Sequence, residues 1–236
     1  MAHQSAERWF APLNSWRSRA EPCGSTGNFW NEIVAQLDNL LRFYYAISEF
    51  SGDPDCILRI GRGIASGRSL LMDGTVIEDG DPIGTLHLWN EHLPRYNPGA
   101  GPDLAWAADI RRRLVESLQS LAQHAGTDPF WHDIKAFRGE AAFSSRLGTL
   151  QLNRVARRHG LECIVRGFSS GRPLRDLGNC MYAYGLARAF NPGAASRQRF
   201  FRRYGELWIS QHTLLTLYGG PNPSRLPRLC AALSLE

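Results

Sequence analysis

Residues 73–94 read DGTVIEDGDPIGTLHLWNEHLP and hold the clearest strand signal of the chain. Asp73-Gly74 and the run EDGDP at 78–82 are rich in the residue types that form tight turns. Residues 83–90 alternate apolar and polar side chains, which predicts a strand, and residues 75–77 form a shorter one. The links between the strands are too short for a crossover, so we expect antiparallel pairing.

Upstream of this stretch, residues 57–60 and 69–72 predict two further short strands of the same β-rich block. Before that block, apolar residues recur at helical spacing from Asn28, which can cap a helix, to about Phe50. Downstream, residues 103–124 carry an apolar stripe with Arg111 to Arg113 mainly on the opposite side, which predicts an amphipathic helix.

The remaining sequence predicts a succession of shorter elements. We expect helices at 129–138, from Ser144 or Ser145 to His159, at 174–190, at 194–208 and from Ser210 to Gly219, and a strand at 161–168. The whole indicates a single α+β domain at 28–219, in which a small, mainly antiparallel sheet packs against several helices. An N-terminal arm at 1–27 and a C-terminal tail at 220–236 flank this domain.

The composition favours anionic partners and a reducing compartment. The 236 residues carry a net charge of +5, and Lys135 is the only lysine among the cations. Arginine grips carboxylates and phosphates with two hydrogen bonds. The five cysteines are scattered and form no closely spaced pair, which indicates reduced thiols. Without a signal-peptide core or a run long enough to span a bilayer, we expect a cytoplasmic protein that is at most peripheral to a membrane.

The first candidate site is the strand end at His87, Glu91 and His92. Alternation places His87 on one strand face with Thr85 and Trp89. The set can supply a histidine acid–base catalyst oriented by a carboxylate, or nitrogen and oxygen ligands for a metal. A purely structural role is the third alternative, and the spacing matches no zinc-protease motif. We expect His87, Glu91 and His92 to be catalytic residues, and we expect no bound metal ion or other cofactor.

Four further residues are expected to contact the substrate. They are Trp89, Asn90, Arg62 and Arg68. Trp89 and Asn90 lie at the same strand end as His87, and the two arginines would hold an anionic group of an anionic or lipid-like small molecule.

Two other clusters of charged residues can each be explained either by ligand binding or by an ordinary structural role. The acidic residues Asp73, Glu78, Asp79 and Asp81 can bind a divalent cation, but Asp is also a standard turn residue, and we favour turns. Arginines at 111–113, 154–158 and 197–203 can form a basic face for a membrane, or simply a solvated surface. Nucleic acid is not expected, because no binding motif is present. No nucleophile motif or phosphate-binding loop occurs either.

Three segments together carry a family resemblance. They are LMDGTVIEDGDPIGTLHLWNEHL at 71–93, LGTLQLNRVARRHGLECIVRGFSS at 147–170 and ELWISQHTLL at 206–215. They resemble the YkoP-like domain of bacteria, which occurs alone or fused to polysaccharide deacetylases, and the likeness extends over roughly residues 30–218. The resemblance implies work on envelope glycans or lipid-linked material. His87 and Asn90 match its motif, which assigns them no catalytic role.

Two functions of different kinds remain. In the first, the chain is an enzyme acting on a lipid-like or glycan-linked anionic small molecule, with His87 as acid–base residue. In the second, it is a non-catalytic accessory protein that docks on a membrane or partner through the basic helical face.

Overall fold

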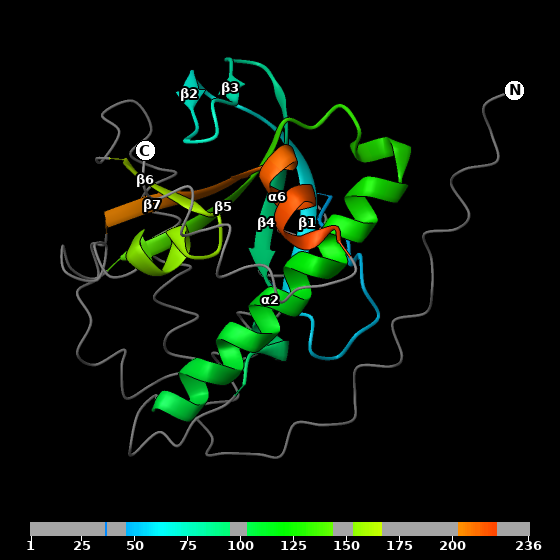
Figure 1. The fold of residues 1–236 in the computed structure, drawn as a ribbon, viewed down its shortest axis with the longest axis vertical. Helices are drawn as coiled ribbons and strands as arrows, with labels where there is room; N and C mark the ends of the chain where they lie inside the picture. The colour runs from blue at the N-terminus through cyan, green and yellow to red at the C-terminus, as the bar shows by residue number, and fades with distance from the viewer. Residues whose placement is uncertain (1–35, 37–45, 95–102, 144–152, 167–202, 221–236) are drawn as a thin grey trace, which may run out of the picture.

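The computed structural model describes residues 36, 46–94, 103–143, 153–166 and 203–220. Its main feature is a five-stranded sheet with the strand order β1-β4-β5-β7-β6 (Figure 1). The strands are β1 (Leu58–Ile64), β4 (Pro82–Leu88), β5 (Ala136–Phe143), β7 (Arg203–Ser210) and β6 (Glu162–Arg166). A separate two-stranded sheet joins β2 (Ser69–Leu70) to β3 (Val76–Ile77).

The sheet is mixed but mainly antiparallel. Strand β1 pairs antiparallel with β4, and β7 pairs antiparallel with both β5 and β6. Strands β4 and β5 are parallel, and the chain between them contains the long helix α2 (Leu104–Thr127). A parallel pair needs such a crossover, because a tight turn can only reverse the chain. The α+β fold and the antiparallel pairing of the first strands are therefore confirmed.

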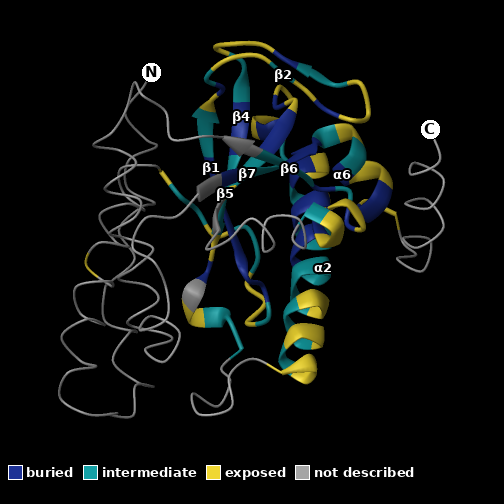
Figure 2. Ribbon diagram, turned by 90° about the vertical axis from the view of Figure 1, so that its left-hand side faces the viewer, coloured by how far each residue is buried: buried dark blue, intermediate teal, exposed yellow. Residues whose placement is uncertain are grey.

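Helix α2 and the short helix α6 (Gln211–Tyr218) cover one face of the sheet (Figure 2). The Asp103 side chain accepts a hydrogen bond from the backbone N–H of Trp106 and caps α2. Ser210 caps α6 in the same way, and Gly219 ends it, as the sequence predicted. Shorter 3-10 turns occur at η2 (Asn90–His92) and η3 (Pro129–Trp131).

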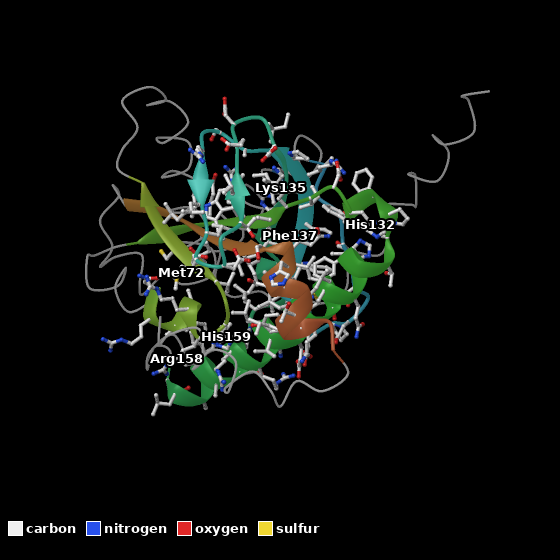
Figure 3. The ribbon with its side chains drawn as sticks, turned by 45° about the horizontal axis from the view of Figure 1, so that its top comes forward. Met72, His132, Lys135, Phe137, Arg158 and His159 are labelled. Carbon is white, nitrogen blue, oxygen red and sulfur yellow. The ribbon has the colours of Figure 1, made fainter. Side chains whose placement is uncertain are left out.

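The main core lies between this face and the two helices. It contains Ile60, Phe137 and Ile209 from the strands, with Leu121 from α2 and Leu214 from α6, all fully buried. Each such side chain contributes about 1.5–3 kcal/mol on leaving water. Figure 3 shows Phe137 on the helix-covered side of the sheet. A smaller apolar cluster on the other face packs Ile83, Trp208 and Ala136 beneath Ile77 and Leu71 of the β2–β3 region.

The β2–β3 hairpin is fastened to the distant end of β7. Asp73 accepts hydrogen bonds from the side chains of Ser210 and Thr213, at the start of α6. Gly74 has φ of +83° in the hairpin turn, where a left-handed backbone favours glycine. Although burial raises it, the pKa of Asp73 is lowered overall by hydrogen bonds from Ser210, Thr75 and Thr213. The turn residue is thus also a tertiary anchor.

Two predicted helices are wrong where the structure describes them. Residues 129–138 form only the 3-10 turn η3 before β5 begins at Ala136, and residues 203–208 belong to β7 instead of the basic helix. Strands β5 and β7 pair along their whole lengths in the middle of the sheet. This long-range pairing outweighs the local helical preference of their alanine, arginine and glutamate residues.

Other predicted elements are confirmed or lie outside the described residues. The strand predicted at 161–168 is β6, preceded by helical residues 153–157 and by Gly160 with φ of +67°. Residues 46–50 are not helical, so the first predicted helix does not reach Phe50. The arm, most of that first helix, the segments 144–152, 174–190 and 194–202, and the tail beyond 220 lie outside the described residues. No helix in the described part is long and apolar enough to cross a membrane.

Candidate active site on the face opposite the helices

The sheet face turned away from α2 and α6 gathers the charged side chains of the strands. Residues directly opposite each other in a ladder point to the same face. By this rule Arg59 of β1 lies beside His87 of β4, and Thr85 of β4 lies beside Arg138 of β5. Across β7 the same row continues through Trp208, which lies opposite both Arg138 and Glu162. We call this surface the polar face.

His87 is half-buried on the polar face. Its Nε2 lies 3.1 Å from the hydroxyl oxygen of Thr85, two residues earlier on the same strand. Trp89 follows the end of β4, and its ring lies under the guanidinium of Arg59, the residue opposite His87, which agrees with the predicted grouping of Thr85, His87 and Trp89 on one side. The imidazole is not sealed in the core, so it meets the first requirement for an acid–base residue.

Arg59 lies directly opposite His87 in the β1–β4 ladder, and the sequence did not single it out. Its side chain is only 2% exposed, and its guanidinium carbon lies 4.5 Å from the ring centroid of Trp89. One of its nitrogens lies 3.4 Å from the carboxylate of Glu91, and Nε lies 3.8 Å from that of Glu49. The two glutamates and the indole therefore hold this buried cation in place.

The predicted partner His92 belongs to the same cluster. Its ring stacks on Trp89 with centroids 3.6 Å apart, and its Nδ1 donates to the carbonyl of Cys56 at 2.8 Å. This bond leaves Nε2 as the basic nitrogen in the neutral ring. Asn90 begins the turn η2, and the structure describes its backbone but not its side chain. In the part of the chain that the structure describes, no three acidic, histidine or cysteine residues are grouped to hold a metal ion.

A second buried cation, Arg138, lies near the middle of the polar face. Its Nη1 lies 3.6 Å from Glu206, and both side chains are almost buried, at 11% and 12% exposed. Glu206 also accepts a hydrogen bond from Trp208 Nε1 at 3.0 Å, and the Arg138 guanidinium lies 5.7 Å from the Trp208 ring. Glu140 lies directly opposite Glu206 across the ladder.

Arg138 and Glu206 escaped the sequence prediction because both fall in segments that were predicted to be helical. Residues 137–140 and 204–207 do alternate between apolar or small and polar side chains, FRGE and YGEL. That period of two was the signal that could have found them.

The structure does not bring the two predicted substrate arginines to His87. Arg62 lies opposite Gly84, three residues before His87, and because this separation is odd it belongs to the other face of the sheet. There its guanidinium donates to the carbonyl of Phe130 at 2.6 Å and pairs with Asp133. Arg68 is 72% exposed in the loop after β1 and pairs with Glu78 at 3.2 Å. Neither position supports a shared site with His87.

The acidic cluster is confirmed as turn scaffolding. Asp79 accepts from the N–H of Gly67 at 2.7 Å, and Asp73 from that of Thr75 at 3.0 Å. Asp81 accepts from the N–H of Glu78 and pairs with Lys135, each at 2.7 Å, and the hydrogen bond from Lys135 is the main cause of its lowered pKa. These carboxylates are occupied by backbone donors and by a lysine.

The predicted basic helical face is partly neutralised. Arg112 pairs with Asp55, Asp109 and Glu116 at 2.7–2.9 Å, and Arg113 pairs with the first two of these. Arg111, Arg154, Arg157 and Arg158 of the set are exposed, and Arg203 begins β7. Figure 3 shows Arg158 at the side of the molecule away from His132. The arginines at 197–202 lie outside the described residues.

The family model of the YkoP domain matches residues 28–165. This is more than half of the chain. The chain belongs to the YkoP domain family. The match includes α2, β1 to β5 and most of β6, and so it contains Arg59, His87 and Arg138 of the polar face. Strand β7, with Glu206 and Trp208, follows the matched part of this YkoP protein. No curated protein and no solved structure matches the chain.

Proposed function

We propose that the chain is an enzyme that acts on an anionic small molecule carried by a lipid or a glycan, with His87 as its acid–base residue. The observation that carries this proposal is the position of His87. Its half-buried imidazole contacts a hydroxyl group at 3.1 Å and has a buried arginine beside it on the neighbouring strand. The Thr85 hydroxyl restricts the orientation of the imidazole, so the ring can transfer a proton to or from a bound substrate. The neighbouring arginine can balance a negative charge on that substrate.

The substrate class rests on two considerations. The buried cations Arg59 and Arg138 flank the His87–Thr85 pair on neighbouring strands, which favours a substrate with a phosphate or carboxylate group. The sequence resemblance to domains fused to polysaccharide deacetylases favours envelope material, and this support is by association. We further propose that the protein acts in the cytoplasm and contacts the membrane surface peripherally.

The test compares purified wild-type protein with His87→Gln and with His92→Gln. Each is incubated with phosphatidic acid, an isoprenyl phosphate and a phosphorylated N-acetylglucosamine, and products are sought by mass spectrometry. We expect conversion of at least one probe class by the wild type and a loss of at least 100-fold in His87→Gln. Conversion by His87→Gln at the wild-type rate would exclude His87 as the acid–base residue.

The alternative, docking through a basic helical face, has less support. Arg112 and Arg113 of α2 are already engaged by carboxylates of the same chain. Cations that are paired internally attract anionic lipid weakly, so these two arginines add little to the basic face.

A further inference from the structure

Arg138 combines burial with an unused hydrogen-bond donor. Its side chain is 11% exposed, and its Nε is fully shielded and has no hydrogen-bond partner. Its closest carboxylate oxygen, on Glu206, lies 3.6 Å from Nη1, which is beyond the range of a good hydrogen bond. A buried donor without an acceptor costs about 1–3 kcal/mol, so it is rare in folded proteins and calls for an explanation.

The covalent shape of the guanidinium suggests what would satisfy this donor. Nη1 is turned toward Glu206, whereas Nε–H and the Nη2 group form a separate edge with two parallel donors. Two oxygens of a phosphate or a carboxylate fit such an edge. Because Nε is shielded and has no partner, an oxyanion that reaches it makes a hydrogen bond for which this donor gives up none.

We infer that Arg138 binds the oxyanion of the ligand that occupies the polar face. This inference rests on the proposed function for the identity of that ligand as the substrate of His87. Arg138 lies opposite Thr85, and Thr85 contacts His87, so the three side chains form a continuous line over β4 and β5. An oxyanion on Arg138 would lie one strand away from the imidazole that handles the proton.

The neighbouring residues explain why this arginine can still accept an anion. Glu206 accepts a hydrogen bond from the indole N–H of Trp208 at 3.0 Å through one oxygen, and its other oxygen lies 3.6 Å from Arg138 Nη1, so the edge formed by Nε and Nη2 is not the one that faces it. Glu140, opposite Glu206, adds a second negative charge to the surroundings. Both carboxylates compete with an incoming anion, so we expect inorganic phosphate to bind with a dissociation constant on the order of millimolar.

Arg62 provides a matched control. It lies on the neighbouring strand but on the opposite face, and the carbonyl of Phe130 and the carboxylate of Asp133 already engage it. Arg62→Gln changes the net charge of the protein by the same amount as Arg138→Gln. Arg62→Gln does not alter a residue of the polar face.

The experiment titrates the full-length protein with sodium phosphate at constant ionic strength, while arginine Nε–H signals are followed by NMR. The Arg138 signal is assigned by its loss in Arg138→Lys. We expect a saturable shift of this signal in the wild type, an affinity at least tenfold lower in Arg138→Gln, and wild-type affinity in Arg62→Gln. Vesicles of phosphatidic acid in phosphatidylcholine form a second arm, which distinguishes a lipid headgroup from a free phosphate.

An Arg138 signal that does not move, or equal phosphate affinity in Arg138→Gln, would overturn the inference. If Arg138→Gln fails to fold, as judged by circular dichroism, the wild-type titration decides alone. His87→Gln separates this inference from the proposed function. Retained turnover in His87→Gln, with phosphate binding lost in Arg138→Gln, defeats only the function. Lost turnover in His87→Gln, with phosphate binding unchanged in Arg138→Gln, defeats only the inference.

Discussion

The Nε2 atom of His87 and the hydroxyl oxygen of Thr85 lie 3.1 Å apart on the same face of β4. Side chains two residues apart on a strand point the same way, so the strand itself sets this pairing. The contact restricts the orientation of the imidazole and occupies one of its two nitrogens. It is therefore the part of the candidate site that mutation can test most directly.

Thr85→Val keeps the shape of the side chain and removes the hydroxyl group. We expect the free energy of unfolding to fall by about 1 kcal/mol, because the hydrogen bond between Thr85 and His87 is lost in a half-buried position. Thr85→Ser, which retains the hydroxyl, should stay within about 0.5 kcal/mol of the wild type. Urea denaturation measures both, and a loss in Thr85→Ser with none in Thr85→Val would show that the methyl group, not the hydrogen bond, matters.

Gly84→Ala tests the packing of the central strands. A Cβ at Gly84 would overlap the ring of Phe137, which is fully buried. Such overpacking costs about 1–3 kcal/mol, and we expect a loss of that size in thermal or urea unfolding. Gly52→Ala is the control, because a Cβ there meets no atom within 4 Å. A neutral effect at Gly84 would mean that β4 and β5 are farther apart than the structure has them.

Asp73→Asn tests the anchor between the hairpin and α6. The pKa of Asp73 is lowered in the folded protein, so its contribution to stability is present above the unfolded value near 3.8 and is lost as the pH falls through the folded value. At pH 7 the variant should lose about 1–2 kcal/mol through weaker bonds to Ser210 and Thr213. As the pH falls below 3.8 and through the folded value, the stability difference between the two proteins should shrink. A difference that stays constant from pH 7 down to the acid unfolding of the wild type contradicts this assignment.

Glu162→Gln should act in the opposite direction. Burial raises the pKa of Glu162, and the nearby charge of Asp73 adds to this effect. A carboxyl group whose folded pKa is raised disfavours folding once it is ionised, so stability falls as the pH rises through that pKa. Glutamine can still accept the hydrogen bond from the N–H of Met72. We expect a gain of roughly 1 kcal/mol at pH 7 and none near pH 4, measured by urea unfolding at both values.

Much of the β4 region could be predicted because its signals are local. The alternation at 83–90 placed Thr85, His87 and Trp89 on one face, and the structure has them there. The stripe at 103–124 predicted α2, and Ser210 and Gly219 predicted the ends of α6. Each of these signals depends on residues within a few positions of one another.

The partners of His87 could not be predicted, because they come from distant segments. Arg62 and Arg68 were chosen for their closeness in sequence, but one lies on the wrong face and the other in a loop. Arg138 reaches the polar face only because β5 is parallel to β4, and that pairing depends on the crossover through α2.

The sequence by itself determined the α+β class, the β4 strand with its two faces, the long amphipathic helix and the acidic turns. Periodicity and turn chemistry act over a few residues, and no other part of the chain is needed to express them. Only the tertiary structure decided that 136–143 and 203–210 are central strands and that Arg59 and Arg138 lie beside the His87–Thr85 pair. Strand pairing is a choice among distant partners, and the burial and hydrogen bonds gained across the whole sheet outweigh local preference.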